Sequence, residues 1–131
     1  METMSPEAIA SVINVYFETM AAMNPGGWVE IFAEDAVIYD PVGKPPINVS
    51  EDSEKFFGLL STFFNSFDIS QEQIFIAGNG AAVKWRMKAS AKNGREATAE
   101  GISVFEINDD GKIQQVLSYW NEAEMMAKLK G

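Results

Sequence analysis

Residues 81–108 read AAVKWRMKASAKNGREATAEGISVFEIN, and this stretch decides the fold. Apolar residues at every second position from Val83 to Ala89 alternate with charged or polar residues, as in a β-strand that buries one face. Asn93 and Gly94 then mark a hairpin turn, and a second strand-like run follows. The stretch therefore predicts two neighbouring antiparallel strands.

The length of the turn decides which side chains face inward. A two-residue turn would place Lys84 and Arg86 on the same face as Ser103, and an anionic ligand would then be expected. A three-residue loop over 92–94, with a left-handed glycine, would instead place Trp85 and its apolar neighbours on that face. We favour the three-residue loop because it keeps the interior apolar.

The rest of the chain extends this pattern into an α+β domain. Helical spacing of apolar residues predicts helices over 6–23 and 28–33 and a third helix from Ser50 onward. The buried stripe of the third helix is expected to consist of Phe56, Leu59, Leu60, Phe63 and Phe64. A short strand is expected over 36–39, a loop over 41–49, four long strands over about 67–77, 81–91, 95–107 and 112–121, and an exposed helix or tail over 122–130. This order predicts a strongly curved, mostly antiparallel sheet wrapped around three N-terminal helices, which makes a cone with an interior.

The composition limits the chemistry. The 131 residues fit one domain spanning 1–131. The chain has no cysteine and no histidine, so neither a disulfide framework nor a zinc or iron site is expected, and acids, tyrosine, lysine and hydroxyls must do any chemistry. The net charge of −9 argues against nucleic acid and acidic membrane surfaces as partners. Without a long apolar run or a basic signal-peptide start, a cytoplasmic protein is expected.

Asp40 is the main candidate for chemistry. In the run VIYDPVG, residues 37–43, a short apolar strand leads straight into an acid. An acid placed where a strand leaves the core loses water around its charged form, which raises its pKa and prepares it to accept a proton near neutral pH. A plain turn is the alternative, because Pro41 fixes φ and favours an extended residue before it.

The whole chain resembles the ketosteroid isomerase (steroid Δ-isomerase) branch of the nuclear transport factor 2-like, or SnoaL-like, superfamily. The matching pieces fall in family order and at family spacing: Tyr16, AEDA at 33–36, DPVG at 40–43, PPI at 45–47, GISVF at 101–105, DGKI at 110–113 and YW at 119–120. The resemblance implies an α+β fold of the cystatin-like barrel type and a pocket for a hydrophobic small molecule.

The resemblance also implies roles for particular residues. Asp40 would be the base that carries a proton from one carbon of a steroid enone system to another, and Tyr16 would donate a hydrogen bond to the dienolate oxygen. At Ser103 the fully active members carry a protonated aspartic acid as a second donor, and loss of one such donor costs about 10²–10³ in rate. The remaining substrate contacts expected are Trp120 and Val116, which alternate inward with Ser118 on the last strand, together with Trp85, Phe56 and Phe57.

The sequence leaves two classes of function open. The first is an isomerase acting on a steroid- or polyketide-like molecule, without a metal or an organic cofactor. The second is a module that binds a hydrophobic small molecule, with Asp40 as a buried polar anchor. A cyclase or hydrolase is a third possibility, which would use the same Asp40 as the isomerase. Because Ile102 and Val104 are expected on the outer sheet face, through which family members are mostly two-fold dimers, a homodimer is expected.

Overall fold

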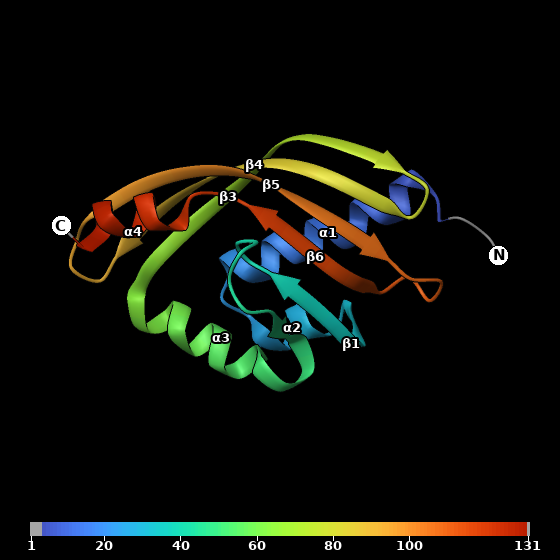
Figure 1. Cartoon of the computed structure of the whole chain (residues 1–131), viewed down its shortest axis with the longest axis horizontal. Coiled ribbons are helices and arrows are strands. Elements are labelled where there is room, and N and C mark those ends of the chain that lie inside the picture. The colour runs from blue at the N-terminus through green and yellow to red at the C-terminus, as the bar shows by residue number, and fades with distance from the viewer. Residues whose placement is uncertain (1–3, 131) are drawn as a thin grey trace.

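Six strands form one curved sheet in the computed structural model, which describes residues 4–130 (Figure 1). The strands are β1 (Phe32–Tyr39), β2 (Ile47–Asn48), β3 (Phe64–Ala77), β4 (Gly80–Ala91), β5 (Glu96–Ile107) and β6 (Ile113–Tyr119). Their order is β2-β1-β6-β5-β4-β3, and each neighbouring pair is antiparallel except β1 and β6, which are parallel. The sheet arches over the first helices and stays open at β2 and β3, so the expected α+β fold with a curved, mostly antiparallel sheet is confirmed.

The hairpin between β4 and β5 turns through the three residues 92–94, as we favoured, because Ala91 and Arg95 on either side are still joined by a backbone hydrogen bond. The amide of Ala91 donates to the carbonyl of Arg95 over 2.8 Å, and Gly94 has a φ of 86°, a left-handed conformation that glycine adopts without strain. Val83 consequently pairs with Ser103, and the apolar residues of β4 face the interior while its lysines and arginine face solvent. The interior is therefore apolar on this side.

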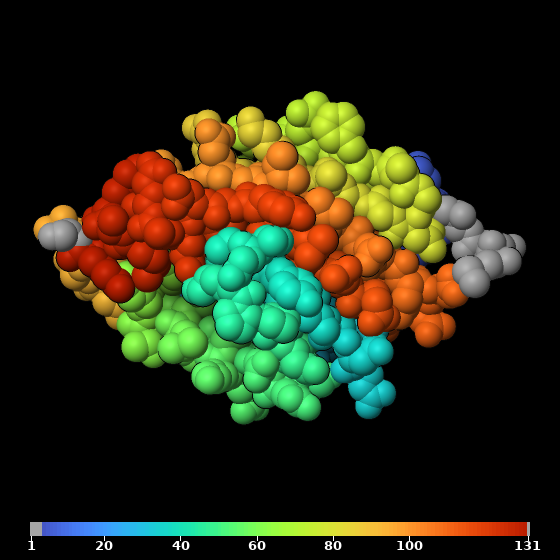
Figure 2. Space-filling model, viewed as in Figure 1, coloured from blue at the N-terminus to red at the C-terminus, as the bar shows by residue number. Residues whose placement is uncertain are grey.

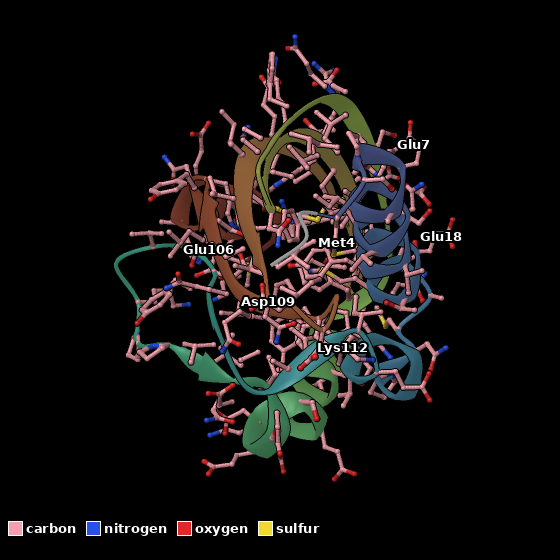
Figure 3. The ribbon with its side chains drawn as sticks, turned by 90° about the vertical axis from the view of Figure 1, so that its right-hand side faces the viewer. Met4, Glu7, Glu18, Glu106, Asp109 and Lys112 are labelled. Carbon is pink, nitrogen blue, oxygen red and sulfur yellow. The ribbon has the colours of Figure 1, made fainter. Side chains whose placement is uncertain are left out.

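The helices are α1 (Pro6–Ala21), α2 (Pro25–Val29), α3 (Val49–Phe63) and α4 (Glu122–Lys130). Ser5 caps α1 by accepting a hydrogen bond from the amide of Ala8 over 3.1 Å. Glu7 and Glu18 lie on the face of α1 that is turned away from the sheet (Figure 3), while the opposite face is buried. This buried face carries Tyr16 into the interior.

The expected second helix over 28–33 is wrong in position. Asn24 caps an earlier helix, α2, by accepting a hydrogen bond from the amide of Gly27 over 3.2 Å. The chain already enters β1 at Phe32, which lies opposite Ile113 in the parallel ladder with β6. Strand pairing therefore takes residues that we assigned to the helix.

The third helix differs from the expected one at its start and along its stripe. Asn48, rather than Ser50, caps α3 by accepting a hydrogen bond from the amide of Glu51 over 3.2 Å. The buried face of α3 includes Phe57, which is 4% exposed, whereas Leu59 is 63% exposed. Phe57 and Leu59 are two residues apart, which places them on opposite sides of the helix, so α3 cannot bury both side chains.

Two further boundaries differ from the expectation. Phe64 opens β3 instead of ending the third helix, so β3 is longer than the strand expected over 67–77. The last segment is the helix α4, which buries Met125 and Leu129 although an exposed helix or tail was expected. Within residues 4–130, no helix combines the length and the apolar character needed to cross a membrane.

Candidate functional site

Asp40 lies directly after β1, beside the end of β6. Because β1 and β6 run parallel, with Tyr39 opposite Leu117, both strands end at the same edge of the sheet. The amide of Val42 donates to the carbonyl of Ser118 over 2.9 Å, which holds the segment after β1 against β6. Figure 2 shows the turquoise atoms of this segment in contact with the red C-terminal part of the chain. The topology thus fixes the position of the Asp40 carboxylate.

One indole anchors the carboxylate of Asp40. Trp120 Nε1 donates to Asp40 Oδ1 over 2.7 Å. Burial raises the pKa of Asp40 above its usual value; the hydrogen bond from Trp120 lowers it, the charge of Glu122 raises it and the charge of Lys44 lowers it, burial being the largest effect. The second carboxylate oxygen has no hydrogen-bond partner among residues 4–130. Asp40 therefore combines an anchored oxygen with a raised affinity for a proton.

Tyr16 lies in the centre of an aromatic cluster. Its ring packs edge-on or tilted against four other rings, with centroids 5.0–6.4 Å away: Phe17, Trp28, Phe32 and Phe105. Burial raises the pKa of the phenol well above its usual value, and the negative charge of Asp40 raises it further. The phenol therefore stays neutral and able to donate a hydrogen bond, and it lies within electrostatic reach of Asp40.

Ser103 is buried in β5 and has a partner on each neighbouring strand. Trp85 Nε1, on β4, donates to Ser103 Oγ over 2.9 Å. The hydroxyl of Ser118, on β6, lies 2.7 Å from that of Ser103, within hydrogen-bond distance. No hydrogen bond joins Ser103 to Tyr16 in the part of the chain that the structure describes. Ser103 is thus held by its neighbours across the sheet.

Gly101 makes room for two indoles. A Cβ atom at this position would lie 2.6 Å from the carbonyl oxygen of Tyr119, 2.7 Å from Trp120 Cβ and 2.8 Å from Trp85 Cζ2. The rings of Trp85 and Trp120 meet edge to face beside it, with centroids 5.7 Å apart and an interplanar angle of 71°. The indole that holds Asp40 and the indole that holds Ser103 therefore support each other.

The other expected contact residues lie in two places. Val116 is fully buried on β6, opposite Phe105. Phe56 and Phe57 instead pack on Trp28, with ring centroids 5.5 and 5.0 Å away. The structure thus connects four of the predicted residues directly, in the order Asp40, Trp120, Trp85 and Ser103.

Three residues beside the predicted ones were not identified as candidates. Ser118 lies between Val116 and Trp120 in the inward alternation of this part of the chain, yet only those two neighbours were predicted as substrate contacts. Gly101 precedes Ser103 in a recognisable run, yet its contact with two indoles depends on the pairing of three strands. Trp28 has a buried Nε1 without a hydrogen-bond partner within residues 4–130, and its sequence neighbourhood gives no signal for this.

Two hollows open elsewhere on the molecule. One, of about 350 Å³, lies between α4 and the neighbouring strands and is lined by Arg86 and Lys128 among others. The other, of about 580 Å³, lies between α1 and β3 and is lined by Phe17 and Gln71 among others. Neither is lined by Asp40 or by the residues bonded to it, so both are separate from the candidate site.

Comparison with known proteins gives matches of sequence and of fold. A family model described as "SnoaL-like domain" matches residues 13–116. A protein named "Steroid Delta-isomerase" from Nocardioides simplex is 28% identical over 123 residues, which cover 94% of this chain and 97% of that protein. This relative spans almost the whole chain, including the positions of all the candidate residues.

Solved structures show the same fold at low sequence identity. An NTF2-like protein of unknown function from Burkholderia pseudomallei has a TM-score of 0.85 at 16% identity, covering 98% of this chain and all of that one (100%). A putative SnoaL-like polyketide cyclase from a Jannaschia species has a TM-score of 0.83 at 12% identity, covering 100% of this chain and 99% of that one. At such identities the likeness concerns the architecture alone.

Proposed function

Because the chain belongs to the SnoaL-like domain family, we propose that it is an enzyme that moves a proton at a carbon next to a carbonyl in an apolar, steroid- or polyketide-like small molecule. The net reaction is the migration of a double bond, with Asp40 as the base and Tyr16 as a donor to the oxygen. The 28% identical relative named Steroid Delta-isomerase, which covers 94% of this chain, supports this choice of reaction.

The environment of Asp40 is the observation that carries the proposal. A base in such a reaction must take a proton from a weakly acidic carbon and later give it back, so it needs a raised pKa. Burial raises the pKa of Asp40, and the hydrogen bond from Trp120 fixes one oxygen so that the other is free to receive the proton. Both requirements of a proton carrier are met by one side chain.

The proton and the electrons balance without a co-reactant. The Asp40 carboxylate takes the proton from the carbon next to the carbonyl, and the electron pair of the broken C–H bond forms the enolate double bond and places charge on the oxygen. The neutral phenol of Tyr16 donates a hydrogen bond to that oxygen, where preorganised donors lower the barrier most. The protonated Asp40 then returns the proton to the far carbon of the conjugated system. The substrate leaves as its isomer.

Because Asp40 takes the proton and returns it to the same substrate molecule, the proposed reaction is written without a metal or an organic cofactor. We also infer that the enzyme acts in the cytoplasm and as a homodimer, and that its ligand is a hydrophobic small molecule. The apolar side chains around Tyr16 support the choice of ligand, since they offer few partners to a charged substrate.

The test compares Asp40→Asn with the wild type on a β,γ-unsaturated ketosteroid. Asparagine keeps the shape and can still accept the hydrogen bond from Trp120, but it cannot take up the proton. We expect the rate of enone formation, followed by ultraviolet absorbance, to fall by about 10²–10⁴. The matched control is Asp35→Asn, which changes an exposed acid on β1, the strand that precedes Asp40, and should keep the wild-type rate.

Two outcomes would contradict the proposal. Equal rates for wild type and Asp40→Asn, with both proteins folded, would exclude Asp40 as the base. Tight binding of a phenolic steroid by a wild type that never turns over the ketosteroid would instead support a binding module, with Asp40 as a polar anchor.

A further inference from the structure

Trp85, Ser103 and Ser118 form a buried polar cluster across β4, β5 and β6. An indole N–H can only donate, whereas each serine hydroxyl has one hydrogen and can accept two hydrogen bonds. The three groups together hold three hydrogens, but only two hydrogen bonds join them. One hydroxyl hydrogen therefore has no acceptor inside the cluster, in a region where polar groups are normally paired.

The unpaired hydrogen belongs to Ser103 when Ser118 donates to it. Ser103 Oγ then accepts from both Trp85 and Ser118, so its acceptor capacity is filled. A hydroxyl in this state can only donate, and the bonds it accepts polarise and strengthen the bond it donates. Such a group suits a carbonyl or enolate oxygen.

Ser103 lies between the base and the phenol along the inner face of β5. Gly101, two residues before it, touches Trp120, the residue that holds the base. Phe105, two residues after it, packs on the ring of Tyr16 with centroids 5.0 Å apart. Alternate residues of a strand share a face, so a substrate that reaches from the base to Tyr16 passes over Ser103.

We propose that Trp85 and Ser118 are positioning residues that act through Ser103, making its hydroxyl the second donor to the carbonyl oxygen of the substrate. The inference rests on the proposed function for the kind of substrate. In the ketosteroid isomerases that this chain resembles, a single aspartic acid is the second donor. Here three residues on three strands would together provide that donor. The two bonds that Ser103 accepts polarise its hydroxyl and strengthen the hydrogen bond that it donates.

The test measures binding of two probes: equilenin, a phenolic steroid, and the same ring system without the phenol oxygen. Trp85→Phe keeps a ring against Trp120 but has no N–H, Ser118→Ala removes one hydroxyl, and Ser103→Ala removes the donor itself. We expect Ser103→Ala to weaken binding of equilenin by about 3- to 10-fold, the range for a hydrogen bond between neutral groups. Trp85→Phe and Ser118→Ala should each weaken it by about 2- to 5-fold, because they only polarise the donor.

The decisive measurement repeats the two positioning changes in the Ser103→Ala background. There we expect neither Trp85→Phe nor Ser118→Ala to weaken equilenin binding further, and in no background should they affect the probe without oxygen. Losses of the same size with and without Ser103 would overturn the inference, because they would report packing alone. Met87→Leu, on the same face of β4, is the control for packing and should leave the preference for the oxygenated probe unchanged.

The outcomes separate this inference from the proposed function. If Asp40→Asn abolishes turnover but the changes at Trp85 and Ser118 remain additive with Ser103→Ala, the reaction stands and the inference is wrong. If Asp40→Asn leaves turnover unchanged while the two changes depend on Ser103, the cluster is an oxygen-binding site and the proposed role of Asp40 as the base is wrong. Equal affinity of the wild type for both probes would also overturn the inference.

Discussion

The half-buried carboxylate of Asp40 makes the stability of this fold depend on pH. Burial raises the pKa of Asp40 in the folded state above the value of about 3.9 expected for an unfolded chain. The folded state therefore binds this proton more tightly than the unfolded state does. The resulting stabilisation is complete below about pH 3.9 and is lost as the pH rises through the folded pKa of Asp40.

Asp40→Asn should remove this pH dependence. The asparagine side chain carries no charge at any pH. From about pH 4 upward, the free energy of unfolding of the variant should therefore exceed that of the wild type, by up to about 1.4 kcal/mol for each unit by which folding raises the pKa of Asp40. Urea unfolding of both proteins across a pH series measures the difference. Asp35→Asn, which changes an exposed acid, should show no such gain. An advantage of the variant that grows toward acid pH would contradict the expectation.

Trp120→Phe should move the pH dependence of the proposed reaction. The indole N–H stabilises the charged form of Asp40, so its removal raises the pKa of Asp40. The base acts only when ionised, and the rising limb of kcat/KM against pH should therefore shift to higher pH. Trp28→Phe is the control, because the indole of Trp28 does not touch Asp40 and should leave the limb in place. A limb that shifts to lower pH after Trp120→Phe would contradict this role.

At the scale of the elements, the close approach of β4, β5 and β6 depends on Gly101. Gly101→Ala would place a methyl group 2.6–2.8 Å from three neighbouring atoms, one of them in the backbone. We expect it to lower the free energy of unfolding by about 1–3 kcal/mol, as overpacking does, which urea unfolding measures. Gly58→Ala, in α3, meets nothing within 4 Å and should instead add up to about 1 kcal/mol. Equal effects of the two changes would show that position 101 is not crowded.

The elements differ in how well the sequence predicts them. The strand alternation around Trp85 and the glycine at 94 together determine the register of β4 and β5, because a slip of one residue would turn Lys84 and Arg86 inward. The short helix before β1 was misplaced because its end depends on the pairing of Phe32 with Ile113 on β6, a residue far away in the sequence.

The candidate site shows the same division between local and distant information. Asp40 is marked by its own neighbours, an apolar strand before it and a proline after it. Its bond to Trp120 joins residues 80 positions apart, and the bond between Trp85 and Ser103 exists only because β4 and β5 pair in one register. Contacts of this kind follow from the fold and leave no periodic signal in the sequence.

At the scale of the whole molecule, the outer face of the sheet is divided into a charged part and an apolar part. In the charged part, Lys84, Arg86 and Lys88 form ion pairs of 3.5–3.9 Å with acids on the strands beside them. Each of these positive charges is thus paired with a nearby negative charge on this face, although the chain as a whole carries a net charge of −9. A second molecule would meet little net repulsion there.

The apolar part runs across four strands. The register places Phe75, Ala82, Val104 and Leu117 in one row, with Ile102 and Tyr119 in the next. Phe75 is 63% exposed, Tyr119 50% and Ile102 46%, whereas Val104 is half-buried. Apolar side chains that gather in this way on the surface mark a site of association, and a two-fold axis through the row would bury it in both copies at once.

Ile102→Glu should therefore convert the expected homodimer into a monomer. Two-fold symmetry would bring the new carboxylates of both copies into one apolar interface, and the dissociation constant should rise by at least about 100-fold, since such like-charge contacts cost several kcal/mol. Light scattering during size-exclusion chromatography measures the mass of each protein across a range of concentrations. Leu59→Glu is the matched control, because Leu59 is exposed to a similar or greater degree but lies on α3, away from the outer sheet face. A wild type that remains monomeric at the highest concentration, or a loss of association by Leu59→Glu as large as that by Ile102→Glu, would show that the apolar row serves another purpose.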